Sequence, residues 1–365
     1  MTSELNYSII AVNDLMVFVI SVFKQMGCTE VDSKLAAEVL LKSDLRGIDS
    51  HGVARLSGYI RLWEKGRINT KPNIKVLRDK TSTATLDGDA GLGLVVAPRA
   101  MEMAIEKAKT CGSGWVAVSN SNHFGIAGYH AMKALAYNMI GHAMTNASPL
   151  VAPTFSKERM LGTNPICYAI PAGKCGPVVI DMATSAAANG KLEISQRKNQ
   201  SLPLGWIQTD DGIETRNPHG LKEGGSLLPL GSNRMMGSHK GYGLSAMVDI
   251  ISGVLSGANF GPWVPPFVSF LEVQPNLPGK GLGHFLGAME IDGFCDVEDF
   301  KSRMDRWIER FKISIPIDAA NPVIIPGEPE AEFEKERIIS GIPLIIDVVN
   351  DLKKVAIHFN LDHPF

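Results

Sequence analysis

The sequence predicts an α/β protein with helical ends. Apolar side chains recur with a helical period near both termini, over residues 13–66 and 342–360. Between them, short runs rich in valine and isoleucine are typical of strands and alternate with helix-like segments. With 365 residues, of which 45% are hydrophobic, the chain is long enough to bury a large core.

Three helices are expected at the N-terminus, at 13–27, 29–47 and 49–66. Each begins at a polar residue that can cap a helix and ends at a glycine. The first contains the apolar run "LMVFVISVF" at 15–23, which is too short to span a bilayer and has no basic residue before it. We therefore interpret the run as a buried helix face, and we expect a cytoplasmic protein without a signal peptide or a membrane segment.

The rest of the chain is predicted to alternate between strands and helices. Strands, with their turns, are expected at 83–93, 114–125, 142–149, 162–171, 177–185 and 283–292, and a short hairpin at 205–215. Helices are expected at 95–112, 126–141, 187–200, 240–257, 296–314 and 342–360. The helix at 240–257 is so apolar that we expect it in the core.

Composition excludes several classes of protein. The formal net charge is −2 and no block of like charges occurs, so we expect no nucleic-acid partner. The five cysteines form no C-x-x-C pair, and there is no H-E-x-x-H sequence, so we expect no metal site. We interpret the cysteines as reduced and mostly buried.

Common nucleotide and nucleophile motifs are absent. The nearest approach to G-x-G-x-x-G is "GLGLVVA" at 91–97, which lacks the third glycine, so a Rossmann site is disfavoured. Neither a P-loop nor a G-x-S-x-G elbow occurs. Ser50 and His51 are adjacent, but neighbouring residues rarely form a nucleophile–base pair, which disfavours a hydrolase.

The stretch "RGIDSHGVARL" at 46–56 carries the clearest chemistry. If Ser50 caps the third helix, His51, Arg55 and Tyr59 follow at intervals of four and lie on one face. The helix N-terminus and the nearby arginines should keep His51 neutral, whereas a bound carboxylate would help it hold a proton. A 2-oxo acid reductase needs such an arginine fork and such a proton donor. The alternative is a solvated helix face.

Other polar residues lie at predicted strand ends, where open α/β sheets bind ligands. Asn122 and His123 follow one strand, Thr163 lies in the turn "GTNP", and Asp181 ends the strand "VVID". Lys240 precedes a helix whose N-terminal amides can face a phosphate. Each of these residues alone is consistent with ordinary turn chemistry, and only the set indicates a site.

Taken in order, "RGIDSHGVARL", "SNHFG", "GTNP", "DMATS", "HKGYG" and "IPGEPE" resemble the malate/L-lactate dehydrogenase family, from about residue 5 to the C-terminus. That family lacks a Rossmann fold and includes ureidoglycolate dehydrogenase, sulfolactate dehydrogenase, diketogulonate reductase and piperideine-2-carboxylate reductase. The resemblance implies a family-specific, non-Rossmann NAD(P)-binding fold. It also implies a homodimer with NAD or NADP as cofactor.

The resemblance also implies an organisation and a set of roles. We expect a helical N-terminal region at 1–75, a cofactor- and substrate-binding α/β region at 76–315, and a segment at 316–365 whose helix packs back on the N-terminal region. Catalytic roles fall on Ser50, His51, His123 and Asp181, and substrate binding on Arg55, joined by Tyr59 and Thr163. Cofactor contacts are expected from Asn122, Ala147, Ser148, Asp181, Met182, Ala183, Lys240, Gly327, Glu328 and Pro329.

The expected reaction is hydride transfer between NAD(P) and a small 2-hydroxy or 2-oxo acid, with malate/oxaloacetate or lactate/pyruvate as leading pairs. Within the family, a cyclic imino acid reductase or a ureidoglycolate or sulfolactate dehydrogenase is the alternative. A non-catalytic nucleotide-binding protein is the alternative of another class. We favour His51 over His123 as the proton donor, and the choice between NAD and NADP stays open.

Overall fold

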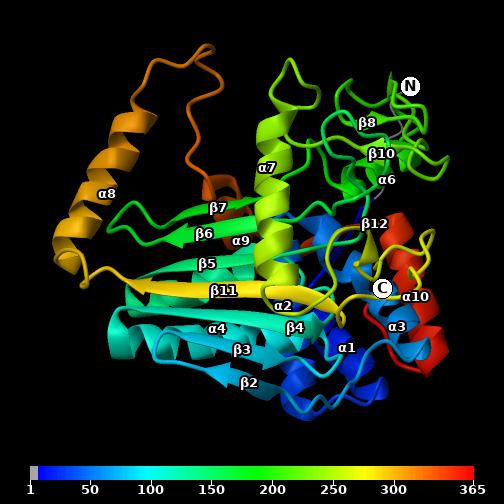
Figure 1. Ribbon diagram of the computed structural model, residues 1–365, viewed down its shortest axis with the longest axis horizontal. Helices are drawn as coiled ribbons and strands as arrows, with labels where there is room; N and C mark the ends of the chain where they lie inside the picture. Colours follow the sequence, from blue (N-terminus) through cyan, green and yellow to red (C-terminus); the bar gives the residue numbers. More distant parts are fainter. Residues whose placement is uncertain (1–6) are drawn as a thin grey trace.

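A seven-stranded mixed sheet forms the centre of the computed structural model, which describes residues 7–365 (Figure 1). Across the sheet the strands are β2 Lys75–Asp79, β3 Thr83–Asp87, β4 Ser113–Ser121, β11 Leu282–Glu290, β5 Met139–Thr145, β6 Ile166–Ile170 and β7 Val178–Met182. Within it, β3 and β4 run parallel, and every other neighbouring pair is antiparallel. The α/β class is confirmed, although the sheet is mostly antiparallel.

Helix α4, Gly93–Cys111, and the short α5, Ala127–Met132, cover one face of the sheet. Small residues on both α4 and β4 let the helix backbone approach the strand closely. A Cβ atom on Gly114 of β4, for example, would lie 1.9 Å from the carbonyl oxygen of Ala104. The helix therefore depends on glycine and alanine at this contact.

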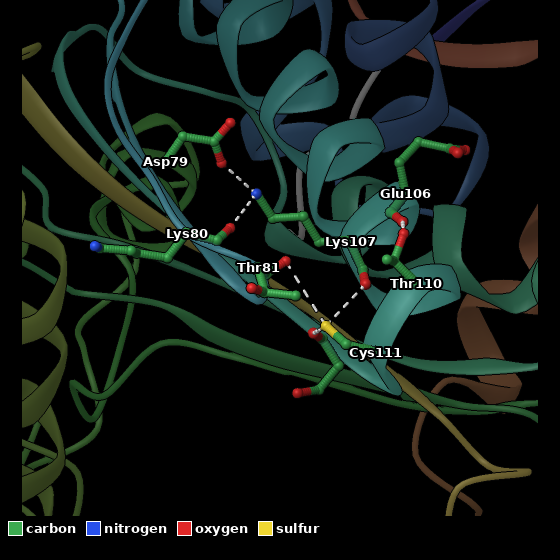
Figure 2. A network of polar contacts seen from close by, with 8 residues as sticks. Asp79, Lys80, Thr81, Glu106, Lys107, Thr110 and Cys111 are labelled. Atoms are coloured by element: carbon green, nitrogen blue, oxygen red, sulfur yellow. Dashed lines mark hydrogen bonds and ion pairs between the residues drawn. The ribbon is translucent and has the colours of Figure 1, made fainter.

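Side chains at the C-terminal end of α4 contact the edge of the sheet at and just after β2 (Figure 2). Lys107 pairs with Asp79 and donates to the carbonyl of Lys80 at 2.6 Å, while Cys111 contacts the carbonyl of Thr81. All five residues of β2 are exposed. The sequence does not predict this strand, because it has no buried face to create an alternating pattern.

The two ends of the chain pack together beside the sheet (Figure 1). The helices are α1 Val12–Gln25, α2 Glu30–Leu45, α3 Leu56–Glu64 and α10 Ile346–Phe359. Strand β1, Tyr7–Ile10, pairs antiparallel with β12, Ile342–Ile345. The expected return of the C-terminal helix to the N-terminal region is confirmed, but residues 1–6 of the predicted region 1–75 lie outside the described residues. The domain boundaries stay predictions.

A smaller layer surrounds a separate apolar cluster that includes Leu192, Ile207 and Leu221. It contains α6, Asn189–Arg197, and a three-stranded sheet. The strands of this sheet are β8 Ile207–Gln208, β9 Glu214–Thr215 and β10 Ser226–Leu227. Strands β8 and β9 are antiparallel, which confirms the predicted hairpin at 205–215.

Helix α7, Ser238–Asp249, crosses the other face of the central sheet and continues into a π-helical turn at Ile250–Val254 (Figure 1). The expectation that this helix is a core helix is wrong for one of its sides. Six apolar side chains on it and just after it are exposed: Tyr242, Leu244, Met247, Ile250, Val254 and Leu255. The two remaining helices, α8 Val297–Lys312 and α9 Glu328–Ser340, lie between β11 and β12 in the sequence.

The predicted helix at 49–66 is wrong in its first half. Two 3₁₀ turns, Asp49–His51 and Val53–Arg55, precede α3. The cause is a tertiary contact, because the Asp44 carboxylate accepts a hydrogen bond from the Val53 amide at 2.8 Å. Gly52 lies directly on that carboxylate, where a Cβ atom would be 2.0 Å from Oδ1.

Other boundaries also differ from the predictions. The helix expected at 126–141 ends at 132 and continues as a 3₁₀ turn to 137, because β5 already begins at 139. The segment 342–360 begins as β12, and α9 and β1 were not predicted.

The expectation of mostly buried cysteines is wrong, since Cys111 and Cys175 are exposed whereas Cys28 and Cys167 are buried. Within residues 7–365, no helix is long and apolar enough to cross a membrane.

Candidate active site

The turns at 49–55 bring Ser50, His51 and Arg55 together. The hydroxyl of Ser50 lies 2.9 Å from Nδ1 of His51, and Nε of Arg55 donates to the carbonyl oxygen of Ser50 at 2.5 Å. The predicted proximity is therefore present, but it comes from a folded-back loop and not from one helix face. When Nδ1 of His51 carries the ring proton and donates it to the Ser50 hydroxyl, Nε2 is left as a free acceptor for a ligand.

A second imidazole lies over the first. The rings of His51 and His123 are stacked, with centroids 5.9 Å apart and planes inclined by 21°. The hydroxyl of the fully buried Tyr59 lies 2.6 Å from Nδ1 of His123. The ring of Phe267 contacts His123 with a centroid distance of 4.6 Å. The chain thus joins the two histidines that the sequence analysis singled out.

Both imidazoles are held neutral. Burial lowers the pKa of His51 from 6.5 to about 4, and the positive charge of Arg55 adds to the effect. Burial also lowers the pKa of His123 well below 6.5, with smaller contributions from His51, Arg55 and His284. A neutral His51 was expected because of a helix end and nearby arginines, whereas desolvation is the larger cause of its lowered pKa.

Two cavities flank Arg55, each of about 170 Å³. Asp44 and Ser50 line the first, and Phe267 with Arg61 and Lys222 lines the second. Each has room for a small organic acid. Arg55 is therefore the one predicted substrate contact that lines both cavities.

Sequence reasoning missed three residues of this region. Glu193 of α6 lies 3.3 Å from Arg55. The carboxylate of Asp44 holds the loop by its hydrogen bond from the Val53 amide, and the ring of Phe267 packs on His123. Glu193 lies in a segment predicted only as a helix, and Phe267 lies in the loop after α7. No local pattern links either residue to the loop at 46–56, because the contacts form only on folding.

A third cavity, of about 390 Å³, lies at the end of β7. It is lined by Asp181 and Met182 together with Gly327, Pro329 and Glu330. This cavity joins two motifs that are far apart in the sequence.

Backbone contacts shape this third cavity. Asp181 accepts a hydrogen bond from the amide of Gly128 at 2.6 Å, and burial raises the pKa of Asp181 to about 6. Gly327 has φ +89° and lies so near Val179 that a Cβ atom would be 2.8 Å from that residue's Cβ. A larger residue at 327 would therefore strain the backbone and push on β7.

Several predicted residues have other visible partners. Among the described residues, no hydrogen bond joins Asp181 to either imidazole. The side-chain nitrogen Nδ2 of Asn122 donates to the carbonyl oxygens of Ala90 and Gly91 at 2.9 and 3.0 Å. These hydrogen bonds hold the loop before α4. Glu328 pairs with Lys312.

The remaining predicted residues surround the site less directly. The hydroxyl of Ser148 accepts from the amide of Phe267 at 2.8 Å, so it positions the ring that covers His123. The amide of Ala147 donates to Asn164, and the carbonyl of Thr163 accepts from Thr184. Ala183 follows β7, and Lys240 is exposed in the first turn of α7. The roles of these residues stay predictions.

Comparison with known proteins identifies the family. A family model described as malate/L-lactate dehydrogenase matches residues 10–353. The chain is 44% identical to a malate dehydrogenase of Pyrococcus abyssi, covering 96% of this chain and 95% of that one. It is 37% identical to a malate/(S)-sulfolactate dehydrogenase of Methanothermus fervidus, covering 94% and 96%. The crystal structure of a malate dehydrogenase from Entamoeba histolytica superposes with a TM-score of 0.91 at 33% identity, over 99% and 100% of the two chains.

Proposed function

The chain belongs to the malate/L-lactate dehydrogenase family and is an oxidoreductase that acts on a hydroxy acid, and from this premise we propose that it interconverts malate and oxaloacetate with NAD(P). A nicotinamide cofactor, when bound, supplies or accepts the hydride. The observation that carries the assignment is the stacked pair of neutral imidazoles beside Arg55.

In the proposed reduction, Arg55 holds the substrate carboxylate and His51 gives a proton to the carbonyl oxygen. The guanidinium offers parallel donors that match a carboxylate. A neutral His51 whose proton is on Nδ1 has none to give from Nε2, but the negative carboxylate beside it raises its pKa against the lowering by burial and by Arg55. Substrate binding and protonation of His51 are therefore coupled. In the oxidation, neutral His51 accepts the proton of the hydroxyl.

The second imidazole is proposed to position the reacting group. The Tyr59 hydroxyl contacts Nδ1 of His123 and the ring of Phe267 packs on its imidazole, so this ring has little freedom to turn. A fixed ring next to the proton donor suits orientation of the carbonyl. His123 stays the alternative proton donor, because its Nε2 atom is not used in the contact with Tyr59.

The second cavity favours a dicarboxylic acid. Arg61 and Lys222 both line it, so an acid whose first carboxylate is on Arg55 meets further positive charge there. Lactate has no second carboxylate to use this charge. The similarity to malate and sulfolactate dehydrogenases supports the same choice, because each of these names implies a substrate with two acidic groups.

The cavity at the end of β7 is the proposed cofactor site. Its backbone at Gly327 has no side chain to fill the space, and the carboxyl groups of Asp181 and Glu330 can accept hydrogen bonds from ribose hydroxyls. Carboxylates repel a 2′-phosphate, and the one arginine of the lining, Arg46, is already 3.1 Å from Glu334. We therefore expect NAD to be preferred over NADP.

The test is a panel of 2-oxo acids with each reduced cofactor, followed by the near-UV absorbance. Oxaloacetate with NADH should give the highest kcat/KM, above pyruvate, sulfopyruvate and piperideine-2-carboxylate. Faster reduction of the imino acid would favour the cyclic imino acid reductase. Cofactor binding without turnover on any substrate would favour the non-catalytic nucleotide-binding protein. A homodimer and a cytoplasmic location complete the proposal.

A further inference from the structure

Arg55 is already paired with a carboxylate of this chain. Nη2 of Arg55 lies 3.3 Å from Oε2 of Glu193, on α6. The other oxygen of Glu193 accepts a hydrogen bond from the side-chain amide of Asn189 at 2.8 Å. The carboxylate is thus oriented by its own helix toward the guanidinium.

Helix α6 lies against the loop that carries Ser50 and Arg55. A Cβ atom on Gly190 would be 2.5 Å from the Cβ of Ser50 and 3.3 Å from Nη2 of Arg55. The absence of a side chain at this position lets the helix backbone touch the loop. Glu193 then reaches Arg55 from the next turn of the same helix.

The ion pair also separates the two cavities. Ala54, Arg55 and Glu193 line both of them, whereas Ser50 lines the first and Phe267 the second. Neither imidazole lines either cavity, but the hydroxyl of Ser50 contacts His51 and the ring of Phe267 contacts His123, so each cavity is one residue away from an imidazole.

We propose that Glu193 is an internal competitor that the substrate's carboxylate displaces from Arg55, so that α6 opens only for an anionic substrate. The inference rests on the proposed role of Arg55 in substrate binding. A guanidinium whose Nε is committed to Ser50 cannot hold two carboxylates side by side without repulsion between them. An uncharged molecule gains nothing from Arg55 and leaves the pair closed.

The central test is Glu193→Gln, which keeps the size of the side chain and an oxygen for Asn189 but removes the charge. Glu193 is about one-third exposed, and the ion pair is therefore of modest strength. We expect KM for oxaloacetate, and Kd for the non-reacting dicarboxylate malonate, to fall by about two- to five-fold.

Glu223→Gln is the matched control. Glu223 also accepts a hydrogen bond from an asparagine, Asn217, at 2.7 Å, but it is exposed and lines neither cavity. The Glu223→Gln substitution removes the same charge from the same part of the molecule. If Glu223→Gln lowers KM as much as Glu193→Gln does, the effect comes from net charge and the proposal is wrong.

The displacement of Glu193 from Arg55, with the opening of α6, is called the gate. Backbone hydrogen exchange of residues 189–197 without any ligand tests this gate separately from catalysis. Glu193→Gln should exchange about two- to five-fold faster there than the wild type and the Glu223→Gln control. Unchanged exchange would overturn the proposal, whatever the kinetics. If the wild type reduces no 2-oxo acid but Glu193→Gln shows faster exchange and tighter malonate binding, the gate stands and the proposed function fails. Turnover in the wild type with no change in KM, Kd or exchange leaves the function standing and refutes the gate.

Discussion

The two imidazoles differ in the groups that hold them, which decides their expected roles. His51 contacts a hydroxyl on its own loop and lies beside Arg55, whereas His123 is locked between Tyr59 and Phe267. His51→Ala should therefore lower kcat by about 10²–10⁴-fold, the usual effect of losing a general acid, with cofactor Kd unchanged. His123→Ala should have a smaller effect on kcat. If His123→Ala is the more damaged variant at equal cofactor affinity, the two roles are reversed.

Arg55 offers a second test at the residue scale. Arg55→Lys keeps the charge but loses the planar fork and the hydrogen bond from Nε to Ser50. We expect kcat/KM for oxaloacetate to fall about ten-fold or more, on the order of 1.4 kcal/mol. Circular dichroism and the thermal midpoint should show that the variant is folded. Unchanged kinetics would remove Arg55 from the substrate site.

What the sequence revealed about single residues follows from distance along the chain. Ser50, His51 and Arg55 lie within one turn-rich loop, so their proximity was predicted even though the helix was wrong. Glu193 and Phe267 reach the same place from distant segments, and neither lies in a motif. Spacing rules detect neighbours within an element, whereas contacts between elements depend on packing that a single sequence does not show.

At the scale of elements, α6 should respond to a single added methyl group. Gly190→Ala places a Cβ atom where Ser50 already lies, so helix and loop must separate. We expect the hydrogen bond between Ser50 and His51 to be disturbed as well, and kcat for oxaloacetate reduction to fall by about ten-fold or more, on the order of 1.4 kcal/mol. Gly293→Ala is a fitting control, because the nearest atom to a Cβ there is the Glu290 carbonyl oxygen at 3.6 Å, an ordinary contact distance. Equal activity of the two variants would show that α6 does not need to touch the loop.

Element prediction failed where a tertiary contact or an open face overrode the local pattern. The buried Asp44 carboxylate captures the amide of Val53 and breaks the predicted helix, and the apolar α7 has one exposed side instead of lying in the core. Long periodic helices such as α1, α2 and α4 were predicted almost to their ends. Their buried faces are wide enough for the period to be visible in the sequence.

At the scale of the whole molecule, α7 is the best candidate for the proposed dimer contact. Its apolar side chains are exposed, and the sheet also carries half-buried aromatic rings, where Trp115 stacks on Phe285 with centroids 5.6 Å apart. A large apolar surface of this kind usually marks a protein contact. Met247→Glu combined with Ile250→Glu should shift the protein from dimer to monomer in sedimentation velocity. Val76→Glu, on the exposed edge strand β2, should leave the dimer intact, and a monomeric wild type would contradict the proposal.

Buried histidines should also make the whole molecule sensitive to acid. Burial lowers the pKa of five of them well below 6.5: His51, His123, His130, His142 and His284. In the unfolded chain these imidazoles become protonated near pH 6.5. In the folded chain they stay neutral until about pH 4 or below. Between these values the unfolded state binds more protons, so the free energy of unfolding falls as the pH falls.

Three buried aspartates act in the opposite direction. Burial raises the pKa of Asp181 and Asp249 to about 6, and that of Asp44 well above 3.8, so the folded state gains protons there before the unfolded state does. The five histidines outnumber the three aspartates, so near pH 5 we expect the unfolded chain to bind more protons than the folded chain, and the free energy of unfolding to fall as the pH falls. Urea unfolding at fixed protein concentration between pH 7.5 and 4.5 should show this loss. His284→Gln, which keeps partners for Ser121 and Thr145, should reduce the slope by about one proton. A free energy of unfolding that stays constant or rises toward pH 5 would mean that these histidines are protonated in the folded protein, and the neutral imidazole pair on which the proposed reaction depends would then be wrong.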